Sequence, residues 1–267
     1  MKLGDKSIAA LVVVLGVVVA VPIARGGVHD SRCGAGFVRD GASCRPGVNA
    51  PPLDLEARVV ISAARLDLTA ADWEQSARQN RAAVDVPAFA IDAFEANDHG
   101  RARGGMSYDD AVAHCTHRGG HVPSEPEWVR AFTARRDPSA KLTRYPWGET
   151  GAVCRRAAWG YALRSDPPDR SEAEGKTRHA ERALAMCGYF ADAPDYVGAH
   201  AAGDTELGVH DMAGNVAEWA LALDGAPVVK GGSFLSNSAS ELRYWWRDNL
   251  PRDSHEPGVG VRCAYAL

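Results

Sequence analysis

Residues 208–219 read GVHDMAGNVAEW, and this stretch decides the fold because it belongs to a series of five segments in a fixed order. Three segments precede it: PAFAIDAFE at 87–95, then MSYDDA at 106–111 with Cys115, Gly119-Gly120 and PSEPEW at 123–128 after it, and then YPWGE at 145–149. The fifth segment follows it and begins with KGGSF at 230–234. It continues through Arg243 and Arg247 to GVRC at 260–263. One such segment is a weak signal, whereas five in series are specific. The main domain therefore spans about residues 55–267.

The series resembles the sulfatase-modifying-factor domain, also called the formylglycine-generating-enzyme-like domain. PSEPEW is similar to the family's LPTEAEWE segment, YPWGE to its PWGD/E turn, and GVHDMAGNVAEW to GLYDMSGNVWEW. KGGSF and the residues after it resemble RGGSW…R…R…GFRC. The resemblance implies an α+β fold, a C-type-lectin-like variant with low regular secondary structure and long ordered loops.

The composition limits the possible functions. The 267 residues are 46% hydrophobic, which is enough for one large domain or two small ones with a proper core. The net charge of −4 supplies no basic field, so the sequence argues against a nucleic-acid partner. Six cysteines suit a globular domain with a few disulfides in an oxidising compartment.

Residues 1–30 have the layout of a signal peptide or an N-terminal membrane anchor. Lys2 and Lys6 precede an apolar run at residues 8–24, which Arg25 closes. At 17 residues the run is at the lower limit of a membrane span, so cleavage and retention both stay open, and a buried core helix is a third interpretation. Either of the first two makes residues 31–267 extracytoplasmic: periplasmic, membrane-anchored or secreted.

Local patterns predict the elements that follow. In residues 31–54, Cys33 and Cys44 bracket a Gly-rich loop that looks like a local disulfide loop, and a Pro-rich linker comes after it. In the main domain, β-branched residues 59–61 indicate a strand, and the alternation over 84–91 indicates another. Ser107 is a suitable N-cap for one helix, and Ser124 with Glu127 forms a capping box for a second.

The resemblance also implies a disulfide framework. In lectin-like folds of this kind a helix cysteine is often bridged to the last strand, which favours Cys115–Cys263. That pairing leaves Cys154–Cys187 and Cys33–Cys44. The cysteine count alone permits many other connectivities.

The residues that carry the family's known chemistry are missing from this sequence. Formylglycine-generating members bind copper(I) through two cysteines that follow the Gly-Gly-Ser, and hydroxyls do not replace such soft thiolates. The family pattern puts Ser236 and Glu241 at those positions, which disfavours copper. A second branch holds iron with histidines from an additional helical bundle. Residues 31–85 contain no histidine and are too short for a bundle, which disfavours iron as well.

Calcium is the cofactor that the resemblance favours. Family members hold a structural calcium ion with a Gly-Asn-x-x-Glu-Trp loop, through side-chain and carbonyl oxygens that suit a hard cation. The matching residues are Gly214, Asn215, Val216 and Glu218. The alternative is that Asn215 and Glu218 only hydrogen-bond the loop to itself.

Residues 233–249 form the candidate ligand-binding surface, because active members bind substrate there and aromatics and arginines are concentrated in it. The candidates are Ser236, Asn237, Glu241, Arg243, Tyr244, Trp245 and Arg247. The competing interpretation is that Tyr244 or Trp246 turns into the core while Arg247 forms a structural ion pair. We expect both interpretations to hold in part, with one tryptophan inside and one near the groove.

The leading hypothesis is a non-catalytic extracytoplasmic module that binds a peptide, a glycan or an envelope partner. The alternative is a metal-dependent oxidoreductase with an unrecognised site, for which only His114, His117 and His121, with His99 nearby, offer ligands. A weaker third hypothesis is a structural subunit of an envelope complex.

Overall fold

The computed structural model describes residues 33–40, 43–68, 83–137, 139–151, 155–160, 193–236 and 238–267. The predicted signal or anchor at 8–24 lies outside these ranges. Within them, no helix has the length and apolar character needed to cross a membrane.

The centre of the molecule holds two three-stranded sheets. In the first, β6 (Phe89–Asp92) lies between β3 (Arg58–Ile61) and β12 (Ala264–Ala266), and both pairings are antiparallel. All four residues of β6 are buried, as expected of a central strand. The last strand of the chain therefore joins the strand of the first family segment.

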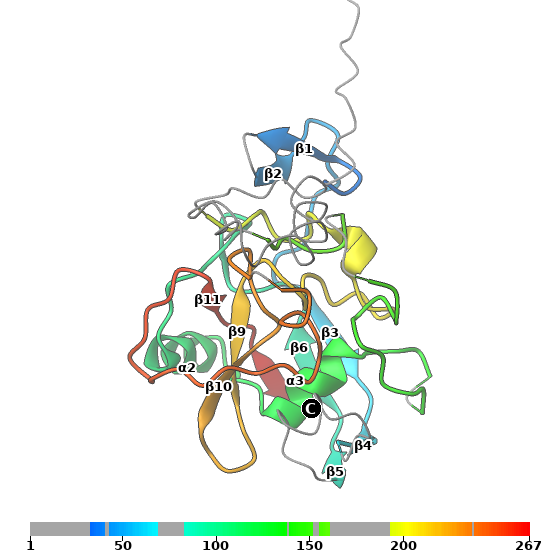
Figure 1. Ribbon diagram of the computed structural model, residues 1–267, viewed down its shortest axis with the longest axis vertical. Coiled ribbons are helices and arrows are strands. Elements are labelled where there is room, and N and C mark those ends of the chain that lie inside the picture. Colours follow the sequence, from blue (N-terminus) through cyan, green and yellow to red (C-terminus); the bar gives the residue numbers. More distant parts are fainter. Residues whose placement is uncertain are drawn as a thin grey trace, which may run out of the picture.

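In the second sheet, β9 (Ala217–Leu221) lies between β10 (Pro227–Lys230) and β11 (Val259–Gly260). The β10 pairing is antiparallel and the β11 pairing is parallel. In Figure 1 this sheet is drawn to the left of β3 and β6.

The prediction of a single strand at 84–91 is wrong, because the structure has two strands in this stretch. β5 (Ala83–Val86) pairs with β4 (Ala64–Asp67), whereas β6 belongs to the central sheet. Pro87 lies at the break, since it has no N–H to donate and interrupts a strand ladder. The alternation at 84–91 therefore does not describe one continuous face.

Both predicted helices are confirmed with their caps. α2 covers Tyr108–His117 with Ser107 as N-cap, and α3 covers Glu125–Phe132 with Ser124 as N-cap. Each start is a capping box, in which the serine accepts from the N3 backbone and the N3 carboxylate accepts from the N-cap backbone.

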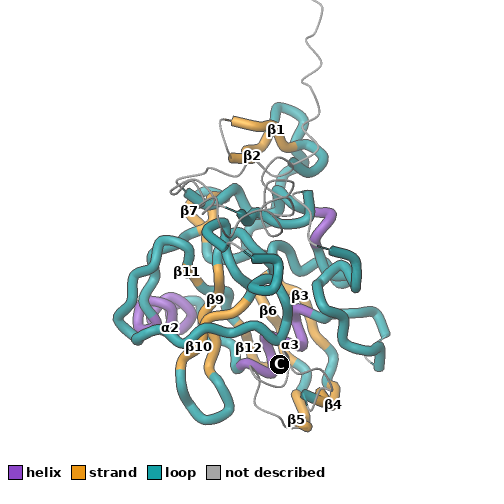
Figure 2. The backbone as a smooth tube through the Cα atoms, viewed as in Figure 1, coloured by secondary structure: helices purple, strands orange, loops and turns teal. Residues whose placement is uncertain are grey.

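Loops make up most of what remains (Figure 2). Two short hairpins join β1 (Phe37–Asp40) to β2 (Ser43–Pro46) and β7 (Asn97–Asp98) to β8 (Arg101–Ala102). A 3-10 turn, η2, covers Ala201–Gly203. The mixture of two helices, several small sheets and long loops among the described residues matches the α+β expectation.

Two of the expected disulfides are present, Cys33–Cys44 and Cys115–Cys263. Cys154 and Cys187 lie outside the described residues. The second bridge ties α2 to the segment before β12, as the resemblance implied.

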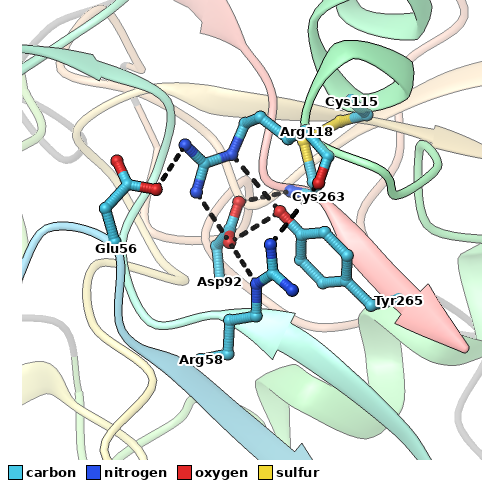
Figure 3. The surroundings of a disulfide bond; sticks show 7 residues. All are labelled: Glu56, Arg58, Asp92, Cys115, Arg118, Cys263 and Tyr265. Atoms are coloured by element: carbon cyan, nitrogen blue, oxygen red, sulfur yellow. Dashed lines mark hydrogen bonds and ion pairs between the residues drawn. A yellow bond between two sulfur atoms is a disulfide. The ribbon is translucent and has the colours of Figure 1, made fainter. Parts of the chain in front are cut away.

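Asp92 lies beside this bridge and joins four elements. Its carboxylate accepts from Arg118 at 3.2 Å and from the Tyr265 hydroxyl at 2.9 Å, and Arg58 stacks over the Tyr265 ring (Figure 3). The end of α2 is thereby fixed to β3, β6 and β12.

Candidate ligand-binding site

A cavity of about 250 Å³ opens over the second sheet, and we call it the β9–β11 cavity. One residue from each strand lies at its wall: Ala217 from β9, Val229 from β10 and Val259 from β11. The other lining residues come from the loop after β10 and from the segment before β11. They are Gly232, Ser233, Leu235, Ser236, Glu241, Trp246, Asp248, Leu250, Glu256 and Gly258.

Gly232 is required for the shape of this cavity. Its φ is +67°, a conformation that non-glycine residues rarely adopt. A Cβ at this position would lie 2.9 Å from the Ser236 Oγ and 3.0 Å from the Glu241 carbonyl oxygen. The loop can therefore fold back on itself and bring residues 236 and 241 to the same wall only when glycine is at 232.

Ser236 is held in a tight turn. Its hydroxyl accepts from the Ser233 N–H at 3.0 Å, and its own N–H donates to the Ser233 carbonyl at 2.9 Å. The carboxylate of Glu241 accepts from the Ser238 N–H at 3.0 Å. Both residues line the cavity, so the positions where the resemblance expects thiolates lie together but carry a hydroxyl and a carboxylate.

The aromatic residues are arranged differently from the expected ligand surface. Tyr244 and Trp245 are 5% and 4% exposed, and their rings meet edge-on in the core with centroids 5.0 Å apart. Trp245 therefore cannot present its ring to a ligand, which corrects its place among the candidates. Trp246 is half-buried and lines the cavity instead. The sequence predicted one tryptophan inside and one near the groove, but it offered Trp246 for the core and Trp245 for the ligand, and the structure reverses the two.

The two candidate arginines are also engaged with the protein. Arg247 forms an ion pair with Glu125 at 3.1 Å, where buried Lys230 joins it at 3.0 Å. The Arg243 guanidinium lies 5.4 Å from the centre of the Trp245 ring. The competing interpretation of Arg247 as a structural ion-pair partner is thus the one that the structure shows. Asn237 lies outside the described residues.

Sequence reasoning missed the acidic side of the cavity. Asp248 and Glu256 line it together with Glu241. Asp248 lies within the candidate stretch 233–249 but is not among its named residues, and Glu256 lies outside that stretch. They come from stretches eight residues apart that only the fold brings to one wall. The sequence shows that both residues carry a carboxyl group. No local sequence pattern predicts the direction in which these side chains point.

Comparison with known proteins agrees with this geometry. The sequence pattern of the sulfatase-modifying factor enzyme 1-like domain matches residues 103–267, more than half of the chain. The chain belongs to this family. The family resemblance and the α+β fold class expected from the sequence are therefore confirmed.

Two curated relatives in this family carry the name inactive C-alpha-formylglycine-generating enzyme 2. The Bos taurus protein is 28% identical over 170 residues, covering 60% of this chain and 48% of its own length. The Mus musculus protein is 27% identical over 170 residues, covering 60% and 47%. The chain thus spans about half the length of these relatives.

Solved structures show the same fold at low sequence identity. The variable protein 1 of Treponema denticola aligns with a TM-score of 0.57 at 14% identity, covering 78% of this chain and 94% of its own. PvdO from Pseudomonas aeruginosa aligns with a TM-score of 0.53 at 17% identity, covering 79% and 94%.

The side chains of the predicted calcium loop contact other groups of the same chain. The Asn215 amide accepts from the Asp195 N–H at 2.8 Å and donates to Glu95 at 2.8 Å. The Glu218 carboxylate accepts from the Trp128 indole at 2.7 Å, while Arg262 forms an ion pair with its other oxygen at 2.8 Å. Because a buried guanidinium already neutralises Glu218, these side chains do not fit a calcium ion.

Glu95 is a further buried partner of this loop. Burial raises the pKa of Glu95 well above its ordinary value, and the charges of Asp211 and Glu218 raise it further. Its carboxylate accepts from Asn215 and from the Val216 N–H at 3.1 Å. The loop at 214–218 is therefore a hydrogen-bonded part of the core.

The histidines give no metal cluster in the described part of the chain. His121 pairs with Glu127 at 3.2 Å, and exposed His99 lies 3.5 Å from Asp98. Among the residues placed by the structure, the one group of three potential ligands within 4.8 Å of one another is Cys44, Asp195 and His200. Cys44 is in a disulfide, so its sulfur is not a thiolate ligand.

Proposed function

We propose that this protein is a non-catalytic, extracytoplasmic member of the family that binds a peptide, glycan or protein partner in the β9–β11 cavity. One observation carries the proposal: the cavity is formed at residues 236 and 241, but the side chains there are a serine and a glutamate. The loop that builds the family's reaction site is retained while its copper ligands are replaced.

The chemistry of the replacements supports a binding role. Copper(I) needs soft sulfur ligands, and neither a hydroxyl nor a carboxylate provides them. The Ser236 hydroxyl is already used as an acceptor within its own turn. The family relatives named inactive are consistent with a member that has lost the reaction and kept the fold.

The disulfides support the proposed location. Bridges of this kind persist in oxidising compartments, and the described part of the chain contains two of them. The apolar run at residues 8–24 would deliver the chain there, as a cleaved signal or as an anchor.

The binding role can be tested by selection from a random peptide display library and by a glycan array. We expect residues 31–267 to retain a defined set of probes, and Trp246→Ala to lose them while its thermal unfolding stays close to wild type. Val60→Ala, at an exposed position outside the cavity, is the matched control. If no probe binds, or if Trp246→Ala retains the same set, the proposed site is wrong.

Restoring the thiols tests the location of the lost chemistry. The variant Ser236→Cys/Glu241→Cys should bind about one equivalent of copper(I) under anaerobic conditions, because two thiolates suit this ion. The Ser236→Cys single variant should bind it much more weakly. Wild-type protein should oxidise no cysteine peptide to formylglycine, and measurable turnover by wild type would overturn the non-catalytic assignment.

A further inference from the structure

The Cys33–Cys44 bridge lies beside a buried histidine–carboxylate pair. His200 and Asp195 are 1% and 0% exposed, and the His200 Nε2 lies 2.8 Å from the Asp195 Oδ2. Ligand atoms of Cys44, Asp195 and His200 all lie within 4.8 Å of one another. Cys33 is bonded to Cys44 and adds a second sulfur to this group, which we call the hairpin cluster. Figure 1 shows β2, the strand that carries Cys44, at one end of the molecule.

Backbone contacts hold both cysteines in place independently of the bridge. Next to Cys33, the Gly34 N–H donates to the Ala199 carbonyl at 2.7 Å, and a Cβ at Gly34 would lie 2.8 Å from that oxygen. Only glycine therefore permits this close approach. The Cys44 N–H donates to the Asp195 carboxylate at 2.9 Å. Opening the S–S bond breaks neither hydrogen bond, so two thiols formed by reduction would stay beside the histidine.

The residues of the hairpin cluster are typical ligands of zinc. Zinc sites in proteins are usually tetrahedral and combine thiolate sulfur, imidazole nitrogen and carboxylate oxygen. Calcium and magnesium prefer oxygen ligands, so a set with two sulfurs does not suit them. The contact between His200 and Asp195 fixes the ring orientation before an ion binds, as carboxylates do for the histidine ligands of zinc. In the bridged protein the two thiolates are missing, because a disulfide sulfur is not a thiolate.

The second described bridge has different surroundings. Cys115 and Cys263 belong to no group of three potential metal ligands in the part of the chain that the structure describes. Both are 0% exposed, whereas Cys33 is half-buried. Since thiol–disulfide exchange requires access to a sulfur, a reductant should open the Cys33–Cys44 bridge first.

We propose that the hairpin cluster is a redox-gated zinc site with Cys33, Cys44, Asp195 and His200 as its ligands. A dithiol reductant supplies two electrons and two protons, which convert the S–S bond to two thiols, and the reductant becomes a disulfide. Zinc then replaces the two thiol protons, which are released to solvent. Oxidation of the two cysteines restores the bridge and releases the ion.

This site is independent of the proposed binding function. The hairpin cluster shares no residue with the lining of the β9–β11 cavity. An oxidising compartment maintains the bridged form, so zinc binds only where a dithiol reductant acts on the protein. Zinc that binds the reduced form should also raise the reduced fraction at a fixed dithiol-to-disulfide ratio, because it binds one of the two states only.

The experiment measures zinc binding by residues 31–267 carrying Cys154→Ser/Cys187→Ser, so that the two described bridges are the sources of thiols. The protein is treated with a mild dithiol, and thiol labelling with mass spectrometry identifies the opened bridge. Elemental mass spectrometry should find about one equivalent of zinc after reduction and none in the bridged protein. Cobalt(II) in place of zinc should give the sulfur-to-metal absorption of a tetrahedral thiolate site. Adding Cys33→Ser/Cys44→Ser should abolish both signals.

His200→Gln tests the imidazole ligand and should weaken zinc binding by on the order of tenfold or more. His210→Gln is the matched control, since His210 also lies beside an aspartate, Asp204 at 2.7 Å, but belongs to no group of three potential ligands among the described residues. It should bind zinc like its parent.

Three results would overturn the zinc site. The first is a reduced, folded protein that binds no zinc. The second is undiminished zinc binding after Cys33→Ser/Cys44→Ser, which would place the ion elsewhere. The third is loss of the native circular dichroism when this bridge alone is opened, because the site requires the cysteines to stay in place without it.

Discussion

Asp204 is a residue whose surroundings change its protonation. It lies 2.7 Å from His210, whose ring stacks on Phe94 with centroids 4.4 Å apart. Burial raises the pKa of Asp204 from 3.8 to about 6. Because the folded state holds this proton more tightly than the unfolded chain does, the free energy of unfolding falls as pH rises from about 4 to about 6.

The variant Asp204→Asn should remove that fall. As pH rises from 4.5 to 7, the free energy of unfolding of the variant minus that of wild type should increase by an amount on the order of 2–3 kcal/mol. Urea unfolding at the two pH values measures the difference. Asp253→Asn, an exposed control, should follow wild type at both. Parallel curves for Asp204→Asn and wild type would show that Asp204 is not the titrating group.

The contacts of Asn215 and Glu218 predict how the protein responds to a chelator. Both side chains are engaged by protein groups, with Arg262 as the cation at Glu218. We therefore expect EDTA to leave Tm unchanged, and elemental mass spectrometry to find no stoichiometric calcium in protein purified without a chelator. A drop in Tm of several degrees, reversed by added calcium, would restore the calcium interpretation of the loop.

At the scale of elements, the helix starts follow directly from local sequence. The Ser124 hydroxyl accepts from the Glu127 N–H, and the Glu127 carboxylate accepts from the Ser124 N–H at 2.8 Å. This exchange needs only residues three apart, so the sequence could reveal it. The break at Pro87 was also readable in principle, but the alternation around it concealed the change of sheet.

Ser124→Ala should cost about 1 kcal/mol of the free energy of unfolding, because the Glu127 N–H at the start of α3 loses the hydroxyl that accepts its hydrogen bond. Chemical unfolding measures this cost. Ser254→Ala, at a loop serine outside both of these helix caps, should change stability by less than about 0.5 kcal/mol. Equal effects of the two substitutions would contradict the capping role.

At the scale of the whole molecule, the two described disulfides close loops of very different length. Cys115 and Cys263 are 148 residues apart, whereas Cys33 and Cys44 are 11 apart. In the chain-entropy model, a cross-link stabilises more when it closes a longer loop of the unfolded chain. The long bridge should therefore matter more for stability.

Replacing Cys115 and Cys263 by serine should cost about 5 kcal/mol, and replacing Cys33 and Cys44 about 3 kcal/mol. Thermal unfolding of the two double variants, each compared with wild type, measures the order. A larger loss from the short loop would mean that the β1–β2 hairpin carries contacts beyond its bridge, such as the Cys44 N–H bond to Asp195.

The sequence by itself determined the family, the α+β class, both helix starts and the absence of thiols at residues 236 and 241. These depend on residue identity or on short spacings, which are visible along the chain. Only the tertiary structure decided that Trp245 is in the core and Trp246 at the cavity, and that Arg262 neutralises Glu218. It also brought Asp248 and Glu256 to one wall, because loops without a repeating pattern take their side-chain directions from packing against distant segments.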